Sequence, residues 1–196
     1  MTETIYEIRW HGRGGQGAVT SANMLADAGY RAGFKGVMSM PTFGAERRGA
    51  PVTASTRLSR EVLRFFSQVE SPDMVIVLDD SLLPAPATTQ GLASGGFLLI
   101  NSAADPVSLD SGKGFRVAVT DANEIAREAG LVISGAPMVN TAMLGAIARA
   151  TGLIDLEHIE TAMEGVFSKA ALAKNVEAAH QAYERTVCLY AVESVK

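Results

Sequence analysis

The 196-residue sequence predicts an α/β fold. We expect a three-layer α/β/α sandwich on a mostly parallel or mixed sheet, with a helical C-terminal third. Short strand-like segments alternate with helix-like segments over the first two thirds of the chain. Met74–Leu78 is a continuous apolar run, typical of a strand covered on both faces of a parallel sheet. From Asp121 onward the apolar spacing is helical.

The first two thirds of the chain divide into strands, one helix and two glycine- or proline-rich segments. A glycine-rich turn at Gly12–Gly17 separates the first strand from a helix with an apolar face, Ala18–Gly29. Pro41–Pro51 is rich in turn formers, and we expect an ordered loop there. Apolar alternation or short apolar runs predict the strands, which are Ile5–Trp10, Gly36–Met40, Val52–Ser59, Met74–Leu78, Gly96–Asn101 and Phe115–Thr120.

The C-terminal third is expected to form four helices. Asp121 can cap the first of them, and Pro137, whose ring suits a first helical turn, can open the second. The expected helices span residues 121–129, 137–150, 155–166 and 168–193. Neither a linker nor an internal repeat divides the sequence, so we expect a single domain over residues 1–196.

Composition excludes several classes of protein. The 47% hydrophobic content argues against disorder, and the net charge of −4 argues against general nucleic-acid binding. Cys188 is the only cysteine, so the chain can form neither an internal disulfide nor a cysteine-ligated iron–sulfur cluster. The sequence shows no signal peptide and no bilayer-spanning apolar stretch, which predicts a cytoplasmic protein without a membrane partner.

The motif Gly12-Arg13-Gly14-Gly15-Gln16-Gly17 matches the pattern G-x-G-x-x-G between a strand and a helix. Such a loop binds a phosphate through its backbone and the helix N-terminus, or it is only a tight turn. A nicotinamide cofactor would need an acidic residue roughly 20 residues on, at the end of the second strand. That strand is expected to end at Met40-Pro41, so the motif predicts a phosphate or cofactor site rather than a free-standing dehydrogenase.

Arg47 and Arg48 form a second candidate site in the loop at Pro41–Pro51. Adjacent arginines in a Gly/Pro-stiffened loop can bind a phosphate or the carboxylates of a neighbouring chain, and Glu46 could orient one of them. The alternative is a solvated surface loop.

Other polar residues carry weaker signals. His11 precedes the glycine loop and is the histidine best placed for a function. Asp79 and Asp80 follow a strand, where a helix cap is favoured over a magnesium or acid–base pair. The sequence does not decide between capping and binding roles for Lys174 and Asn175.

Three segments together resemble one known family, and the resemblance covers essentially the whole chain. They are residues 7–17, which contain the glycine loop, residues 43–52 with Glu46-Arg47-Arg48-Gly49, and residues 135–146. The sequence is similar to the gamma subunit of the pyruvate and 2-oxoacid:ferredoxin oxidoreductases. The combination of the two loops is far more specific than either loop alone.

The resemblance implies a complex that converts a 2-oxoacid and coenzyme A to acyl-CoA, carbon dioxide and two electrons. It implies thiamine diphosphate between alpha and beta partner chains, and [4Fe-4S] clusters in the beta chain and in a ferredoxin-like delta chain, with ferredoxin or another acceptor beyond them. This chain would be catalytically silent alone and would hold no cofactor tightly. It would contribute to assembly, consistent with its apolar content, and to the coenzyme A site.

The resemblance also implies roles for individual residues of the two loops. The glycines Gly12, Gly14, Gly15 and Gly17 would let the backbone approach coenzyme A, and Arg13 and Gln16 would hydrogen-bond it. Arg47 and Arg48 would bind either phosphate or a partner subunit. The alternative function is a free-standing Rossmann-like nucleotide-binding oxidoreductase. A purely structural subunit, whose glycine loop only packs, is also open, and the sequence does not identify the 2-oxoacid.

Overall fold

The computed structural model describes residues 5–41, 48–64 and 66–190. The strands in this part of the chain are β1 (Ile5–Arg13), β2 (Gly36–Pro41), β3 (Pro51–Ser59), β4 (Met74–Val77), β5 (Phe97–Asn101), β6 (Arg116–Thr120), β7 (Val132–Ile133), β8 (Ala136–Pro137) and β9 (Val187–Cys188). The helices are α1 (Ala18–Arg31), the 3-10 turn η1 (Asp80–Leu82), α2 (Pro86–Thr89), α3 (Pro106–Leu109), α4 (Ala122–Glu128), α5 (Asn140–Thr151), α6 (Leu156–Glu164) and α7 (Lys169–Arg185).

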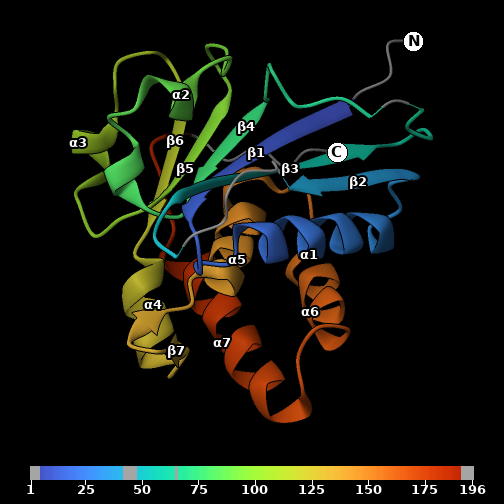
Figure 1. Cartoon of the computed structure of the whole chain (residues 1–196), viewed down its shortest axis with the longest axis vertical. Helices are drawn as coiled ribbons and strands as arrows, with labels where there is room; N and C mark the ends of the chain where they lie inside the picture. Colours follow the sequence, from blue (N-terminus) through green and yellow to red (C-terminus); the bar gives the residue numbers. More distant parts are fainter. Residues whose placement is uncertain (1–4, 42–47, 65, 191–196) are drawn as a thin grey trace.

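The main sheet is mixed, with the strand order β2-β3-β1-β4-β5-β6-β9 (Figure 1). Strands β1, β4, β5 and β6 are parallel neighbours. Strand β3 runs antiparallel between β1 and β2, and β9 pairs antiparallel with the edge of β6. Strands β7 and β8 form a separate hairpin. The predicted α/β class with a mostly parallel or mixed sheet is confirmed.

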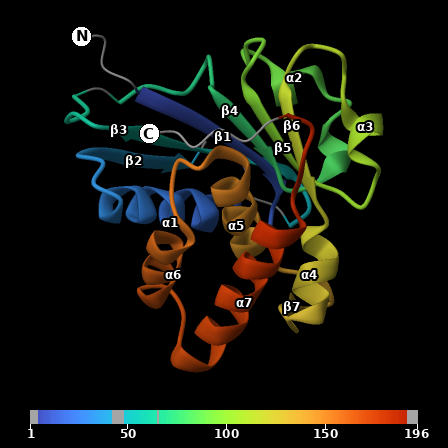
Figure 2. The same ribbon diagram turned by 180° about the vertical axis from the view of Figure 1, so that it is seen from behind.

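The sheet separates two apolar cores. Helices α1, α5, α6 and α7 lie on one side of the sheet, as the two opposite views in Figures 1 and 2 show. Helices α1 and α5 contact the strands, and α6 and α7 pack on these two helices. Trp10, Ile76 and Leu99 belong to the core on this side. Over β4–β6, the other face has its own smaller core, in which Val75 and Ile100 pack with residues of the short η1 and α2 region. The third layer is therefore thin, because it is built from single helical turns.

On β1 and β3 that second face is polar instead of apolar. Arg57 is 2% exposed, and its Nε lies 2.6 Å from Glu7 Oε1. Its guanidinium also donates to the carbonyls of Ser67 and Gln68, the latter at 3.1 Å. The Arg57 side chain, paired with the partly exposed Glu7, therefore links β1 and β3 to the connection between β3 and β4.

Two helix predictions are wrong at their ends. Pro137 does not open a helix but pairs with Val132 in the β7–β8 hairpin, and α5 begins only at Asn140. The hairpin turn at Ser134-Gly135 has positive φ at both residues (50° and 79°), as the twist of a two-residue hairpin requires. The helix predicted over 168–193 stops at Arg185.

The chain after α7 turns extended because the edge of β6 offers unpaired backbone groups. Thr186 has φ −67° and ψ 123°, and the next two residues pair with Val119 and Ala118 as β9. The first strand is also longer than predicted: Gly12 and Arg13 belong to β1, because they pair with Val52 and Pro51. Likewise Pro41 and Pro51 lie in strands, whereas residues 42–47 of the predicted loop lie outside the described residues.

Candidate functional site

The glycine loop lies at the carboxyl edge of the parallel strands. Strands β1 and β4 are neighbours there, with His11 opposite Val77. From β1 the chain continues into α1 on one face of the sheet, and from β4 it continues into η1 on the other face. In open α/β sheets, ligands bind at such a switch point, outside the carboxyl ends of the two strands.

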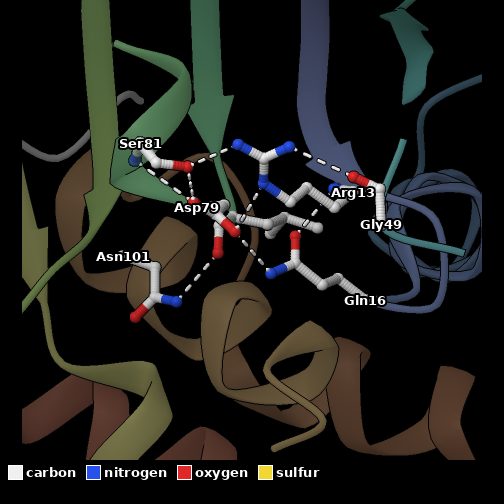
Figure 3. Close-up of polar contacts among 7 residues, drawn as sticks. Arg13, Gln16, Gly49, Asp79, Ser81 and Asn101 are labelled. Atoms are coloured by element: carbon white, nitrogen blue, oxygen red, sulfur yellow. Dashed lines mark hydrogen bonds and ion pairs between the residues drawn. The ribbon is translucent and has the colours of Figure 1, made fainter. Parts of the chain in front are cut away.

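Arg13 closes this switch point with its side chain (Figure 3). Its Nε lies 3.2 Å from Asp79 Oδ2, and its Nη2 donates to Ser81 Oγ at 2.7 Å. The remaining terminal nitrogen, Nη1, donates to the carbonyl oxygen of Gly49 at 3.1 Å. The guanidinium therefore ties the end of β1 to the end of β4 and to the second loop.

Gln16 completes the same network. Its Oε1 accepts from the Arg13 backbone N–H at 2.7 Å, and its Nε2 donates to Asp79 Oδ2 at 3.1 Å. Burial raises the pKa of the Asp79 carboxyl, but hydrogen bonds from Ser81 and Gln16 and the charge of Arg13 outweigh it and hold that pKa below its usual range. Asp79 also caps η1 by accepting from the Ser81 N–H at 3.2 Å, so the predicted capping role is confirmed.

Two glycines of the motif are needed for packing. A Cβ on Gly12 would lie 3.1 Å from Leu78 Cδ1, and one on Gly17 would lie 3.0 Å from Asn140 Cβ. Gly17 also has a φ of +84°, which favours glycine. These two positions let the loop approach β4 and α5 closely.

The other two glycines differ from each other. Gly14 donates to the Ala50 carbonyl at 2.8 Å and accepts from the Gly49 N–H at 3.0 Å, so its backbone is bound to the second loop. Gly15 has a φ of +99°, and a Cβ built on it would have no atom within 4 Å. The space where a Gly15 side chain would lie is therefore open.

A cavity of about 570 Å³ opens beside Gly15 at the N-terminus of α1. No side chain caps this helix, and its first turn contains no acidic residue. The first-turn N–H groups are thus directed at the cavity with the positive end of the helix dipole. The cavity is lined by Arg13, Gly14, Gly15, Gly17, Ala18, Val19, Thr20, Arg48, Val52 and Met138.

Arg48 lies on the rim of this cavity and donates to the Ser134 carbonyl oxygen at 3.4 Å. Arg47 lies outside the described residues. Of the eight residues predicted for the site, the structure thus brings Arg48 and the glycine motif together. It turns the polar ends of Arg13 and Gln16 toward Asp79, whose part in the site the sequence had not indicated.

His11, the histidine that the sequence placed best for a function, does not line the cavity at the glycine loop. It is 7% exposed and lines a different cavity of about 270 Å³ with Arg9 and Thr53. Its Nε2 accepts from Arg9 Nε at 3.0 Å, so protonation would break a hydrogen bond and place two cations side by side. Burial and then the charge of Arg9 lower the pKa of His11 to about 4.

The depressed pKa of His11 predicts acid sensitivity. Unfolded histidine titrates near pH 6.5, so between pH 6.5 and 4 the unfolded chain binds the extra proton. The free energy of unfolding should fall by about 3 kcal/mol as the pH drops through this window. Urea titrations at pH 7 and pH 4 measure this fall in the free energy of unfolding, which should be smaller in His11→Gln than in the wild type. His180→Gln is the control, because His180 is exposed, and it should show the wild-type fall. An unchanged fall in His11→Gln would refute the assignment.

The strand order also argues against a nicotinamide site. The acidic residue that holds the ribose stands at the end of the strand next to β1 in dinucleotide-binding domains. Here the antiparallel strand β3 lies between β1 and β2, so the end of β2 is two strands away from the glycine loop. The second strand also ends at Met40-Pro41, without an acid.

The undecided residues on α7 have different roles. Asn175 is buried and accepts from Thr141 Oγ1 at 3.0 Å, which links α7 to α5. Lys174 is exposed. Among the described residues, no three His, Cys, Asp or Glu side chains gather as a metal site, and no helix is both long and apolar enough to cross a bilayer.

Together, the fold and the site define an α/β protein with a glycine loop and an open helix N-terminus at the sheet's switch point. The profile of the pyruvate ferredoxin/flavodoxin oxidoreductase family matches residues 7–185. The chain is 48% identical over 185 residues to the common subunit gamma of the pyruvate/ketoisovalerate oxidoreductases of Pyrococcus furiosus, covering 93% of this chain and 97% of that relative. It is 42% identical over 194 residues to pyruvate synthase subunit PorC of Thermotoga maritima, covering 96% and 98%.

Solved structures agree. Pyruvate oxidoreductase subunit PORC of Thermotoga maritima matches with a TM-score of 0.82 at 38% identity, over 95% of this chain and 99% of that chain. A 2-oxoglutarate:ferredoxin oxidoreductase from Magnetococcus marinus, solved with 2-oxoglutarate, coenzyme A and succinyl-CoA bound, shares the fold. Its TM-score is 0.73 at 21% identity, and the match covers 92% of this chain and 30% of that chain.

The chain therefore belongs to the pyruvate ferredoxin/flavodoxin oxidoreductase family. It matches gamma-type subunits over nearly their full length, which confirms the resemblance found in the sequence and the assignment to an oxidoreductase subunit. The alternative of a free-standing Rossmann-like oxidoreductase is not favoured.

Proposed function

We propose that this chain is the gamma subunit of a thiamine-diphosphate-dependent 2-oxoacid:acceptor oxidoreductase and that its glycine loop binds the pyrophosphate of coenzyme A. The observation that carries the proposal is the uncapped N-terminus of α1, which opens into a cavity beside Gly15. Backbone N–H groups and the helix dipole favour a phosphate there. The chain's relatives are named as subunits of such oxidoreductases, and one distant relative was solved with coenzyme A bound.

Within this site the residues divide into two groups. The N–H groups at Gly15 and in the first turn of α1, together with Arg48, are the groups available to contact a pyrophosphate. Arg13 and Gln16 act as positioning residues, because their polar groups hold the loop against Asp79. The position of Arg48 on the cavity rim supports phosphate rather than a partner chain as its ligand.

The redox chemistry is assigned to partner chains. Cys188 is the only cysteine of the sequence, and burial raises the pKa of its thiol, which disfavours the thiolate that a cluster needs. Thiamine diphosphate and the [4Fe-4S] clusters are therefore expected in alpha, beta and ferredoxin-like delta subunits, with ferredoxin or another protein as the acceptor. This chain would contribute assembly and the coenzyme A site.

A charge placed in the first turn of α1 tests the site. Thr20 lines the cavity, and Thr20→Asp should weaken coenzyme A binding to the assembled oxidoreductase about tenfold through repulsion of the pyrophosphate. An aspartate in a first helical turn stabilises the helix, so loss of folding would not explain the result. The control is Thr20→Asn, because asparagine is nearly isosteric with aspartate but neutral. Its dissociation constant for coenzyme A should stay within about twofold of the wild-type value.

The measurement is the dissociation constant of coenzyme A, determined by calorimetry on the complex. Equal dissociation constants for wild type and Thr20→Asp would eliminate the glycine loop as the pyrophosphate site. That result would favour the alternative in which the glycine loop serves only for packing.

A further inference from the structure

A second cavity, of about 420 Å³, lies between the β7–β8 hairpin and the beginning of α7. Its walls are mainly apolar and include Leu131, Val132, Ile133 and Phe167. Val132 and Ile133 are 45% and 62% exposed, so two large apolar side chains of a short hairpin are left in contact with water. The cavity is large enough to bury a planar ring system.

The polar edge of this cavity is cationic. Lys174 lines it, and the Lys174 Nζ would lie 3.4 Å from a Cβ built on Gly130, another lining residue. Lys174 forms no ion pair with the described residues. No acidic side chain lines the cavity, and the first turn of α7 contains none. The cavity therefore combines an apolar slot with a positive group and lacks a compensating carboxylate.

The second cavity adjoins the one at the glycine loop. Met138 lines both of them. Asn140 lines the second, and its Cβ lies beside Gly17, which lines the first. A ligand whose pyrophosphate occupies the N-terminus of α1 can therefore extend past Met138 into the apolar slot.

We propose that the second cavity binds the adenosine 3′-phosphate end of coenzyme A, with the adenine between the β7–β8 hairpin and Phe167 and the 3′-phosphate at Lys174. The inference rests on the proposed pyrophosphate site at the glycine loop. Three chemical features of one ligand, a pyrophosphate, an apolar ring and a further phosphate, match three adjoining features of the surface. Charge complementarity selects this occupant over an apolar peptide, which would leave Lys174 without a partner.

The test compares coenzyme A with 3′-dephospho-coenzyme A, which lacks only the 3′-phosphate. Dissociation constants are measured by calorimetry on the assembled oxidoreductase. In the wild type, coenzyme A should bind about tenfold more tightly than the dephospho form. Lys174→Met should abolish this difference, because it should weaken the binding of coenzyme A and leave that of the dephospho form unchanged. Lys35→Met, which removes an exposed lysine that lines neither cavity, is the matched control and should keep the difference.

A second variant tests the apolar slot. Ile133 is exposed, so Ile133→Ser should leave the fold intact. The substitution should weaken the binding of coenzyme A and of 3′-dephospho-coenzyme A by the same factor, roughly threefold to fivefold. A difference between the two ligands that persists in Lys174→Met would overturn the proposal.

The two proposals can fail separately. If Thr20→Asp weakens the binding of both ligands while Lys174→Met weakens the binding of neither, the glycine-loop site stands and the adenosine site is wrong. If Lys174→Met abolishes the difference while Thr20→Asp has no effect, the adenosine site stands and the pyrophosphate lies elsewhere.

Discussion

Arg57→Met is expected to lower the free energy of unfolding by about 3 kcal/mol, because it leaves the partly buried carboxylate of Glu7 without its partner. The guanidinium is 2% exposed, and its Nε lies 2.6 Å from the Glu7 carboxylate. The same substitution also removes the donors for Ser67 and Gln68, whose carbonyls then lose their hydrogen bonds. Urea denaturation followed by circular dichroism measures the change.

Arg31→Met is the matched control, because Arg31 pairs with Asp27 at 2.9 Å on the exposed face of α1. Exposed pairs one helical turn apart contribute little, so this variant should lose less than about 0.5 kcal/mol. The double variant Glu7→Gln/Arg57→Met should be more stable than Arg57→Met alone, since it removes the unpaired charge. Similar losses in Arg57→Met and Arg31→Met would contradict the buried-pair interpretation.

Gly145→Ala is expected to destabilise the protein by about 3 kcal/mol, because α5 and α7 touch at this residue. A Cβ at Gly145 would lie 1.9 Å from the Ala179 carbonyl oxygen and 2.6 Å from its carbonyl carbon. The clash is with the backbone, so no side-chain rotation relieves it, and the two helices must separate. The measurement is again the urea midpoint, with circular dichroism as the probe.

This substitution also bears on the proposed ligand site. The first residue of α5, Asn140, packs against Gly17 and accepts from Ser21 Oγ through its carbonyl at 3.3 Å. Moving α5 would therefore displace the wall shared by the two cavities, and coenzyme A binding should weaken as well. Gly165→Ala, with its nearest neighbour at 3.8 Å, is the control and should be neutral or slightly stabilising. Equal stability of the two variants would refute the contact.

Local sequence signals predicted most of the elements correctly. The apolar run ending at Leu78 identified β4, and the glycine motif identified the strand-to-helix loop. The capping role of Asp121 is confirmed, since its side chain accepts from the Glu124 N–H at 2.8 Å. One clear error fell where a pairing partner distant in sequence decided the outcome. Val187 and Cys188 were assigned to a helix although they pair with Val119 and Ala118 of β6.

In the candidate site, too, local signals were sufficient for the location but not for the contacts. The glycine motif indicated the region of the site. It did not indicate that Arg13 and Gln16 are held by Asp79, a residue 66 positions beyond Arg13. One rule could have indicated the partner: the carboxyl ends of neighbouring parallel strands meet at one edge, and Asp79 follows such a strand. The order of the strands was needed to apply it, and that order is not a local property.

The sequence by itself determined the α/β class, the glycine loop, the lack of cysteines for a cluster and the family. These depend on composition, on short-range periodicity and on motifs whose residues are adjacent in the chain. The tertiary structure alone decided that β3 separates β1 from β2, that Gly15 faces open space while Gly12 packs on Leu78, and that two cavities adjoin at Met138. These features come from packing and pairing between distant segments, which no local pattern specifies.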